Sequence, residues 1–167
     1  MKTAPWTVLL APTDMSDASA PAVACAIDLG RRLGAQVVLF HVISSKDVDR
    51  GVAEGRFLDQ QLADVCSQLN DWYREAIPAA DREGVRVQMA AGMGVPDEEI
   101  LRRATALQAA MVVMATHGRT GLKRGVFGSV AEAVLRHANC PVLTIRTTAK
   151  IDAEPFPVPK TESGAVS

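Results

Sequence analysis

A glycine-rich, basic segment at residues 114–129, MATHGRTGLKRGVFGS, lies between an apolar run and a helical pattern. Its glycines allow the main chain to approach a ligand closely. Gly128-Ser129 falls where the helical pattern starts, and the first amides of a helix have no acceptor inside it. These amides and the helix dipole favour an anion such as phosphate, and the Ser129 hydroxyl adds a donor. Three basic residues add positive field around this predicted phosphate site: Arg119, Lys123 and Arg124.

A second polar group, Pro12-Thr13-Asp14, follows the first apolar run of the chain. The Asp14 carboxylate would repel phosphate, but it can accept hydrogen bonds from a base amino group or a ribose hydroxyl. If the fold brings the two segments together, one wall suits phosphate and the other suits a nucleoside. Together they predict a nucleotide pocket.

Five apolar runs alternate with helical patterns, at residues 6–13, 35–43, 85–91, 109–116 and 141–147. This alternation predicts a single α/β domain with an open, twisted, Rossmann-like parallel sheet that has helices on both faces. Runs one, two and four are apolar nearly throughout, as central strands are, whereas run three alternates and run five is short. The strand order 3-2-1-4-5 satisfies these preferences with right-handed crossovers only.

The helical patterns have recognisable ends. The first carries Val23, Ala26, Ile27, Gly30 and Leu33 and stops at Gly34, and a second carries a stripe from Leu58 to Ala76 that Pro78 should end. Pro96 suits the first position of a third helix, and a fourth runs from about Ser129.

The predicted strand order places a crevice between strands one and four. Ligands of open parallel sheets bind beyond the carboxyl ends of the strands, where the winding direction reverses. Pro12-Thr13-Asp14 and Ala115-Thr116-His117-Gly118 emerge at that point. The glycine-rich segment therefore forms one wall of the crevice.

Structural roles for the same residues stay open. Ser129 and Glu132 fit a Ser-x-x-Glu capping box, and residues 14–17 could cap the first helix. His41 suits a hydrogen-bonded core position, and His117 is given no acid–base role.

The three cysteines, Cys25, Cys66 and Cys140, are expected to be small buried thiols, because they have no disulfide or metal spacing. No catalytic or metal-binding residue is assigned, so turnover is not implied.

Composition limits the function classes. The chain of 167 residues with a net charge of −1 suits one domain and gives no expectation of nucleic-acid binding. The sequence lacks a membrane-spanning apolar stretch and an N-terminal signal core, which predicts a cytoplasmic protein. We expect a domain at residues 1–147, with a polar connection at 44–56 that could act as a flap, and a flexible tail at 148–167.

The segments LLAPTDMSDAS, VVLFHVI and MATHGRTGLKRGVFGSVAEAVLRHANCPVLTIR resemble the universal stress protein family, from about Val8 to Arg146. The ATP-binding branch of that family carries Gly-x2-Gly-x9-Gly-Ser/Thr. Gly118 and Gly128-Ser129 match its second and third elements, and Ala115 replaces its first glycine. The resemblance implies the adenine nucleotide alpha hydrolase-like fold, which is the five-stranded sheet predicted above.

The resemblance also implies a ligand and its contacts. The ligand would be ATP, with Mg²⁺ on its phosphates, bound by a stress sensor or regulator with at most slow hydrolysis. Pro12, Thr13 and Asp14 would contact the nucleoside, and Val42 would meet the adenine through its main chain. The ribose and phosphates would lie against the following residues: Met114, Ala115, Gly118, Gly128, Ser129, Val130 and Ala131.

Family members commonly pair their last strands, and an apolar edge strand favours such an addition. We therefore predict a homodimer through Val142 to Arg146. One alternative is a dimeric stress protein without nucleotide that acts through protein partners, which the Ala115 replacement favours. Another is a phosphotransferase or ATPase that uses Asp14 or His117.

Overall fold

The computed structural model describes residues 7–44, 57–116 and 128–146. Several predictions from the sequence fall outside these residues. They are residues 45–56 of the flap predicted at 44–56, the site residue Gly118 with its neighbours His117, Arg119, Lys123 and Arg124, and the tail at 148–167.

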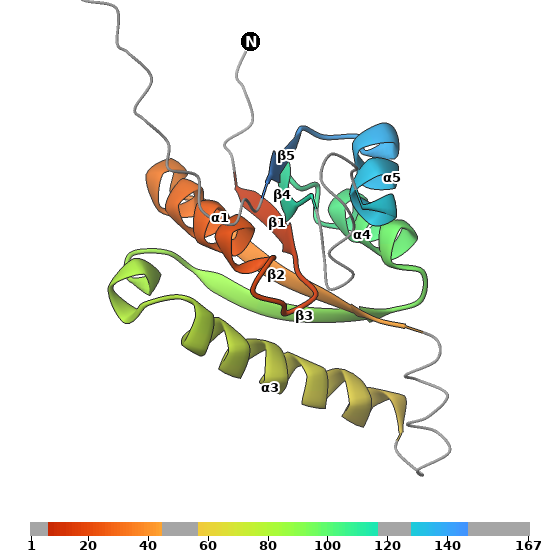
Figure 1. The fold of residues 1–167 in the computed structure, drawn as a ribbon, viewed down its shortest axis with the longest axis horizontal. Coiled ribbons are helices and arrows are strands. Elements are labelled where there is room, and N and C mark those ends of the chain that lie inside the picture. Colours follow the sequence, from red (N-terminus) through yellow and green to blue (C-terminus); the bar gives the residue numbers. More distant parts are fainter. Residues whose placement is uncertain (1–6, 45–56, 117–127, 147–167) are drawn as a thin grey trace, which may run out of the picture.

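The five predicted strands form one sheet. They are β1 (Val8–Pro12), β2 (Gln36–Ile43), β3 (Val87–Met93), β4 (Met111–Ala115) and β5 (Val142–Ile145). The order is β3-β2-β1-β4-β5, and every pairing is parallel (Figure 1). This confirms the predicted order. The central strand β1 is almost entirely buried, whereas β3 alternates along an edge, as their apolar patterns predict.

Helices cover both faces of the sheet (Figure 1). They are α1 (Ala20–Leu33), α3 (Leu58–Ala76), the short 3₁₀ turn η1 (Ala79–Arg82), α4 (Pro96–Ala106) and α5 (Ser129–His137). Because side chains alternate along a strand, neighbours Leu9 and Leu10 enter different cores. Leu9 packs in the core that contains Ile27 of α1 and Leu69 of α3, and Leu10 in the core that contains Ile100 of α4 and Val134 of α5.

The ends of the helices mostly follow the sequence signals. Gly34 closes α1 with φ of +64°, a left-handed conformation that glycine adopts without strain. Pro96 is the first residue of α4, and α3 ends two residues before Pro78. The predicted apolar stripes extend too far at two ends, because Leu33 and Leu58 are each 43% exposed. Both lie in terminal turns, beyond the part of the helix that the sheet covers.

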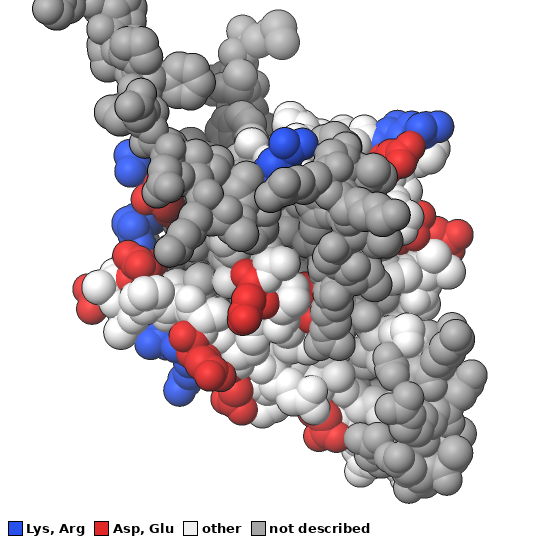
Figure 2. Space-filling view, in the orientation of Figure 1, with Lys and Arg blue, Asp and Glu red and all other residues white. Residues whose placement is uncertain are grey.

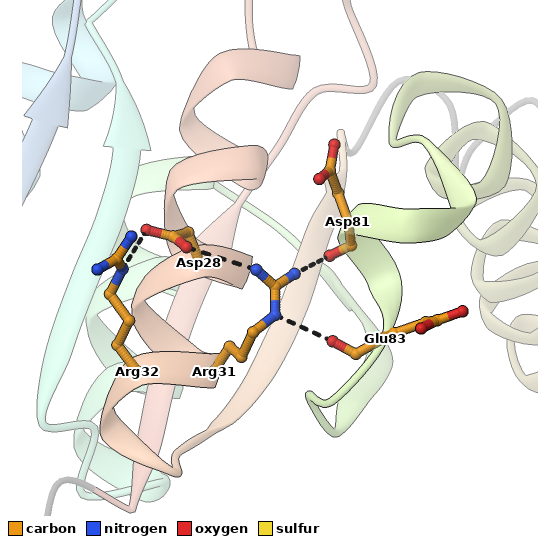
Figure 3. A network of polar contacts seen from close by, with 5 residues as sticks. All are labelled: Asp28, Arg31, Arg32, Asp81 and Glu83. Atoms are coloured by element: carbon orange, nitrogen blue, oxygen red, sulfur yellow. Dashed lines mark hydrogen bonds and ion pairs between the residues drawn. The ribbon is translucent and has the colours of Figure 1, made fainter.

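An arginine joins α1 to the connection between α3 and β3 (Figure 3). Arg31 Nε donates to the carbonyl of Glu83 at 3.0 Å, and its Nη2 donates to the carbonyl of Asp81. Asp28 pairs with Arg31 at 3.5 Å and with Arg32 at 2.7 Å. Only Arg31 of these two arginines reaches across to a segment that is distant in sequence, so it fixes the connection before β3 against α1.

The surface carries both signs of charge. Figure 2 shows basic and acidic side chains interspersed on the face in view, without a continuous basic patch among the residues that it colours. None of the helices in the described ranges is long and apolar enough to span a bilayer.

Candidate functional site

A pocket lies at the carboxyl ends of β1, β2 and β4. Its volume is about 310 Å³, within the range of small-molecule sites. All predicted site residues that the structure describes line it: Pro12, Thr13, Asp14, Val42, Met114, Ala115, Gly128, Ser129, Val130 and Ala131. The fold thus brings together segments from both halves of the chain. Their assignment as nucleotide contacts stays a prediction.

The pocket has further lining residues that no sequence motif assigned to the ligand: Ser19, Phe40, His41, Pro96, Ile100 and Thr116. Phe40 and Val42 are two residues apart on β2, so period-2 alternation places both on the α4 face of the sheet. That alternation is a signal that could have found Phe40. Pro96 and Ile100 come from α4, and their place at the pocket depends on how α4 packs over β2, which local sequence does not specify.

Successive hydrogen bonds fix the loop after β1, and the donor and acceptor of each can be assigned. The Met15 amide donates to Thr13 Oγ1 at 3.0 Å, and Ser19 Oγ donates to the carbonyl of Ser16 at 2.8 Å. Since the Ser19 proton is used there, the 2.7 Å contact between the two hydroxyls has Thr13 as donor. Met15 takes a left-handed φ of +59° inside this turn. The chain therefore turns sharply away from β1 after Thr13.

Asp14 belongs to the same turn. Its Oδ1 accepts from the Ser16 amide at 3.1 Å and from Ser16 Oγ at 2.6 Å. The alternative that residues 14–17 cap the first helix is wrong, because α1 begins at Ala20 with Ser19 as its N-cap residue. Asp14 instead closes a local turn whose serine holds one carboxylate oxygen, and this fixes the carboxylate at the pocket wall.

The two neighbouring strand ends are joined by a histidine. The Thr13 amide donates to the carbonyl of Phe40 at 2.9 Å, which is the last main-chain bond between β1 and β2. Beyond it, His41 Nδ1 lies 2.8 Å from the carbonyl of Thr13. His41 is hydrogen-bonded, as expected, but it is half-buried and lines the pocket instead of lying in the core.

The amino end of α5 forms the opposite wall. Gly128 is the N-cap residue, with no side-chain cap, and its amide donates to the carbonyl of Thr116 at 2.8 Å. The capping box expected of Ser129 and Glu132 is not formed, because Ser129 is already the first helical residue. Glu132 Oε1 accepts from Arg136 instead, at 2.9 Å. The amides of the first helical turn, Ser129 to Ala131, are the ones for which a helix has no internal acceptor.

The cysteines differ from the prediction in one respect: all three are half-buried, not fully buried. Partial burial raises the pKa of the Cys25, Cys66 and Cys140 thiols, so they stay protonated at neutral pH. Within the described part of the chain, no group of three or more His, Cys, Asp or Glu side chains is placed to hold a metal ion.

Comparisons with known proteins agree on a family. Residues 5–146 match the model of the universal stress protein family. A universal stress protein of Methanocaldococcus jannaschii is 34% identical over 146 residues, which cover 85% of this chain and 83% of that protein. Universal stress protein UspA from Lactobacillus plantarum has a similar structure, with a TM-score of 0.68 at 23% identity, over 86% of this chain and 100% of that one.

Two similar structures contain adenine nucleotides. One is a universal stress protein in complex with cAMP, with a TM-score of 0.61 and 19% identity over 87% of this chain and 100% of that one. The other is the universal stress protein from Archaeoglobus fulgidus in complex with dAMP, with a TM-score of 0.57 and 19% identity over 84% of this chain and 98% of that one. At these identities the likeness shows a common fold.

Proposed function

This chain belongs to the universal stress protein family, and from that premise we propose that it binds an adenine nucleotide, ATP as first candidate, in the pocket beyond β1 and β4. The observation that carries the proposal is the convergence of two unlike walls on one pocket. The turn that holds Asp14 forms one wall, and the first turn of α5 forms the other. The two solved relatives that hold cAMP and dAMP support the choice of adenine.

The base is assigned to the main chain of Val42. Even-numbered residues of β2 direct their amide and carbonyl groups toward β1, since the Gln36 amide donates to Thr7 and the Phe40 carbonyl accepts from Thr13. Val42 is the next even residue, and β1 has ended by then. A neighbouring N–H and C=O match the ring acceptor and the amino donor of adenine. Guanine has a carbonyl where adenine has its amino group, so this edge favours adenine.

Apolar side chains form the sides of the base slot. Phe40, Ile100 and Met114 are buried and belong to the core on the α4 and α5 face, and each also lines the pocket. A flat aromatic base buries apolar area against such walls, and its edges remain available for hydrogen bonds. This arrangement supports a nucleoside more than a bare phosphate or a sugar.

The sugar and phosphates are assigned to the polar ends of the pocket. The fixed Asp14 carboxylate is an acceptor for a ribose hydroxyl. The amides of Ser129, Val130 and Ala131 and the dipole of α5 suit the phosphates. The Gly128 amide is already bonded to Thr116, so we assign to Gly128 close approach to the ligand instead of an amide contact. We place Mg²⁺ on the phosphate oxygens and propose at most slow hydrolysis.

We further propose a homodimer that pairs β5 with its copy. Among the described residues, β5 is an edge strand that pairs with β4 alone, and Val142 to Ile145 are all half-buried in the single chain. An unpaired, partly apolar edge is a template for strand addition. A two-fold axis would then make the contact self-complementary.

A second candidate is a nucleotide-free stress protein that acts through protein partners. Ala115 favours it, because this residue lines the pocket where the ATP-binding motif has glycine, and its methyl group takes space from a ligand. Alanine is the smallest possible replacement, so we keep nucleotide binding as the leading proposal and expect weakened affinity.

Calorimetry tests the proposal. ATP and AMP should each give saturable heat with nucleotide-free protein, and GTP should bind at least tenfold more weakly because of its base edge. No heat at millimolar ATP would remove the nucleotide proposal and favour the second candidate. Mass spectrometry of small molecules released by denaturing freshly purified protein provides an independent check, since the leading proposal expects an adenine nucleotide there.

A further inference from the structure

We propose that His41 is a positioning residue: its Nδ1–H takes the place at the Thr13 carbonyl where the Val42 amide would donate in a regular ladder, and this keeps the Val42 amide open for the ligand. This inference rests on the proposed function, because it concerns how the adenine edge of that same pocket is made. It also makes a claim about the empty protein, which allows it to be tested separately.

The regular pattern of a parallel sheet predicts a different bond at this place. A residue whose amide donates to residue j−1 of the next strand accepts, through its carbonyl, from residue j+1. The Thr13 amide donates to Phe40 at 2.9 Å. Continuation of the ladder would therefore have the Val42 amide donate to the Thr13 carbonyl, and the Val42 amide would be consumed inside the sheet.

The structure has another donor on that carbonyl. His41 Nδ1 lies 2.8 Å from it, and among the main-chain hydrogen bonds of the described residues there is none from Val42 to Thr13. The side chain of His41 thus takes the place of one ladder bond. His41, which donates in place of the ladder bond, is the direct neighbour of Val42, whose amide is left open.

The turn after β1 gives the His41 side chain access to the Thr13 carbonyl. Thr13 is held from its other side, through the Met15 amide and the Ser19 hydroxyl, and Met15 has a φ of +59°. The chain therefore leaves the direction of β1 directly after Thr13. A side chain that reaches sideways from β2 can still meet the Thr13 carbonyl, and His41 has the reach and a planar N–H donor.

The chemistry of the contact determines the form of the ring. A carbonyl oxygen can only accept, so Nδ1 must carry the hydrogen. The neutral ring is then the Nδ1–H form, and protonation adds a hydrogen at Nε2 without removing the donor. The bond to Thr13 is consequently kept in both charge states of His41.

The consequence for the ligand is a fixed spacing between two contacts. The bond from His41 holds Thr13, and with it Asp14, against the end of β2. The open amide of Val42 is then available to the ring acceptor of adenine, at a set distance from the carboxylate that meets the sugar. Loss of His41 should let the Val42 amide close onto Thr13 and remove one hydrogen bond to the base.

Amide hydrogen exchange measured by NMR on the ligand-free full chain tests the structural part. In His41→Leu, the Val42 amide should exchange at least tenfold more slowly than in the wild type, since it gains an acceptor. His137→Leu is the matched control, because His137 makes the same kind of bond, to the Ala133 carbonyl at 2.9 Å, but is exposed at the last turn of α5 and does not line the pocket. Equal exchange rates at Val42 in the wild type and His41→Leu would overturn the proposal.

Calorimetry with ATP and with 1-deaza-ATP, whose base has C–H in place of the ring acceptor, tests the binding part. His41→Leu should weaken ATP about tenfold, the worth of one hydrogen bond, and 1-deaza-ATP less than twofold. His41→Asn keeps an N–H donor at the δ position and should restore most of the ATP affinity. If His41→Leu loses equal affinity for both ligands, the proposal is overturned. A wild type that binds neither ligand would contradict the proposed function. Hydrogen exchange at Val42 would then still decide the role of His41.

Discussion

The amide nitrogen of Gly128 lies 2.8 Å from the carbonyl oxygen of Thr116. This bond joins the residue before α5 to the residue after β4, so the first turn of α5 is held at the carboxyl end of the sheet. It also uses the Gly128 amide within the fold. The donors left for an anion at this wall are therefore the amides that follow, from Ser129 to Ala131.

The first prediction concerns the size of residue 128. Gly128 has φ of −62°, which any residue adopts, so the backbone does not require a glycine at this position. Gly128→Ala should cost less than about 1 kcal/mol of folding free energy through the weaker N-cap. Gly128→Val should lower ATP affinity at least tenfold in calorimetry, because a branched side chain enters the pocket. Unchanged ATP affinity in the valine variant would mean that the ligand does not approach this residue.

The second prediction concerns Asp14. Asp14→Ala removes the carboxylate and both hydrogen bonds from Ser16, so it should lower the affinity for ATP about tenfold or more. Asp17→Ala is the matched control, since Asp17 is exposed, lies three residues further along the same loop and gives the same change in charge. If the two variants bind ATP equally well, the ribose contact is wrong.

The sheet could be predicted because its signals are local and repeated. Leu9 to Pro12 and Val37 to Phe40 are apolar without interruption, which only a strand buried on both faces requires, and β3 alternates as an edge strand does. The pocket follows from this order, since the reversal of winding lies between β1 and β4. The position of Asp14 and Ala115 at the pocket could therefore be predicted from the strand order, whereas their contacts with a nucleotide stay predictions.

What sequence could not predict depends on contacts across the fold. Ser129 and Glu132 have the spacing of a capping box, but the bond from Gly128 to Thr116 makes Gly128 the N-cap residue. Likewise, a histidine in an apolar strand looks the same in sequence whether it lies in the core or replaces a ladder bond. The contact of His41 depends on the turn after Thr13, and that turn follows β1, a different strand from the one that carries His41.

The third prediction tests strand pairing at β5. The carbonyl of Pro141 accepts from Val112 of β4 and that of Ile145 from Thr116, directly after β4, so the main-chain groups of Thr144 face the open edge. Thr144→Pro removes an outward amide, which an edge strand tolerates, and should convert the dimer into a monomer in analytical ultracentrifugation. Thr144→Val keeps the amide and should stay dimeric. A wild type that sediments as a monomer at high micromolar concentration would contradict the dimer.

The fourth prediction compares two neighbouring arginines (Figure 3). Arg31→Met loses the bonds to the carbonyls of Asp81 and Glu83 and should lower the free energy of unfolding by about 1–2 kcal/mol. Arg32→Met loses only its exposed pair with Asp28 and should leave the free energy of unfolding nearly unchanged. Urea denaturation measures both, and equal effects would mean that the link from α1 to the β3 connection does not stabilise the fold.

The most direct test of nucleotide binding is a crystal structure of the full chain grown with ATP and Mg²⁺. We predict density for adenine against the main chain of Val42, for ribose beside Asp14, and for phosphates over the amides of Ser129 to Ala131. A pocket that stays empty at saturating ATP, or nucleotide density at another surface, would contradict the account.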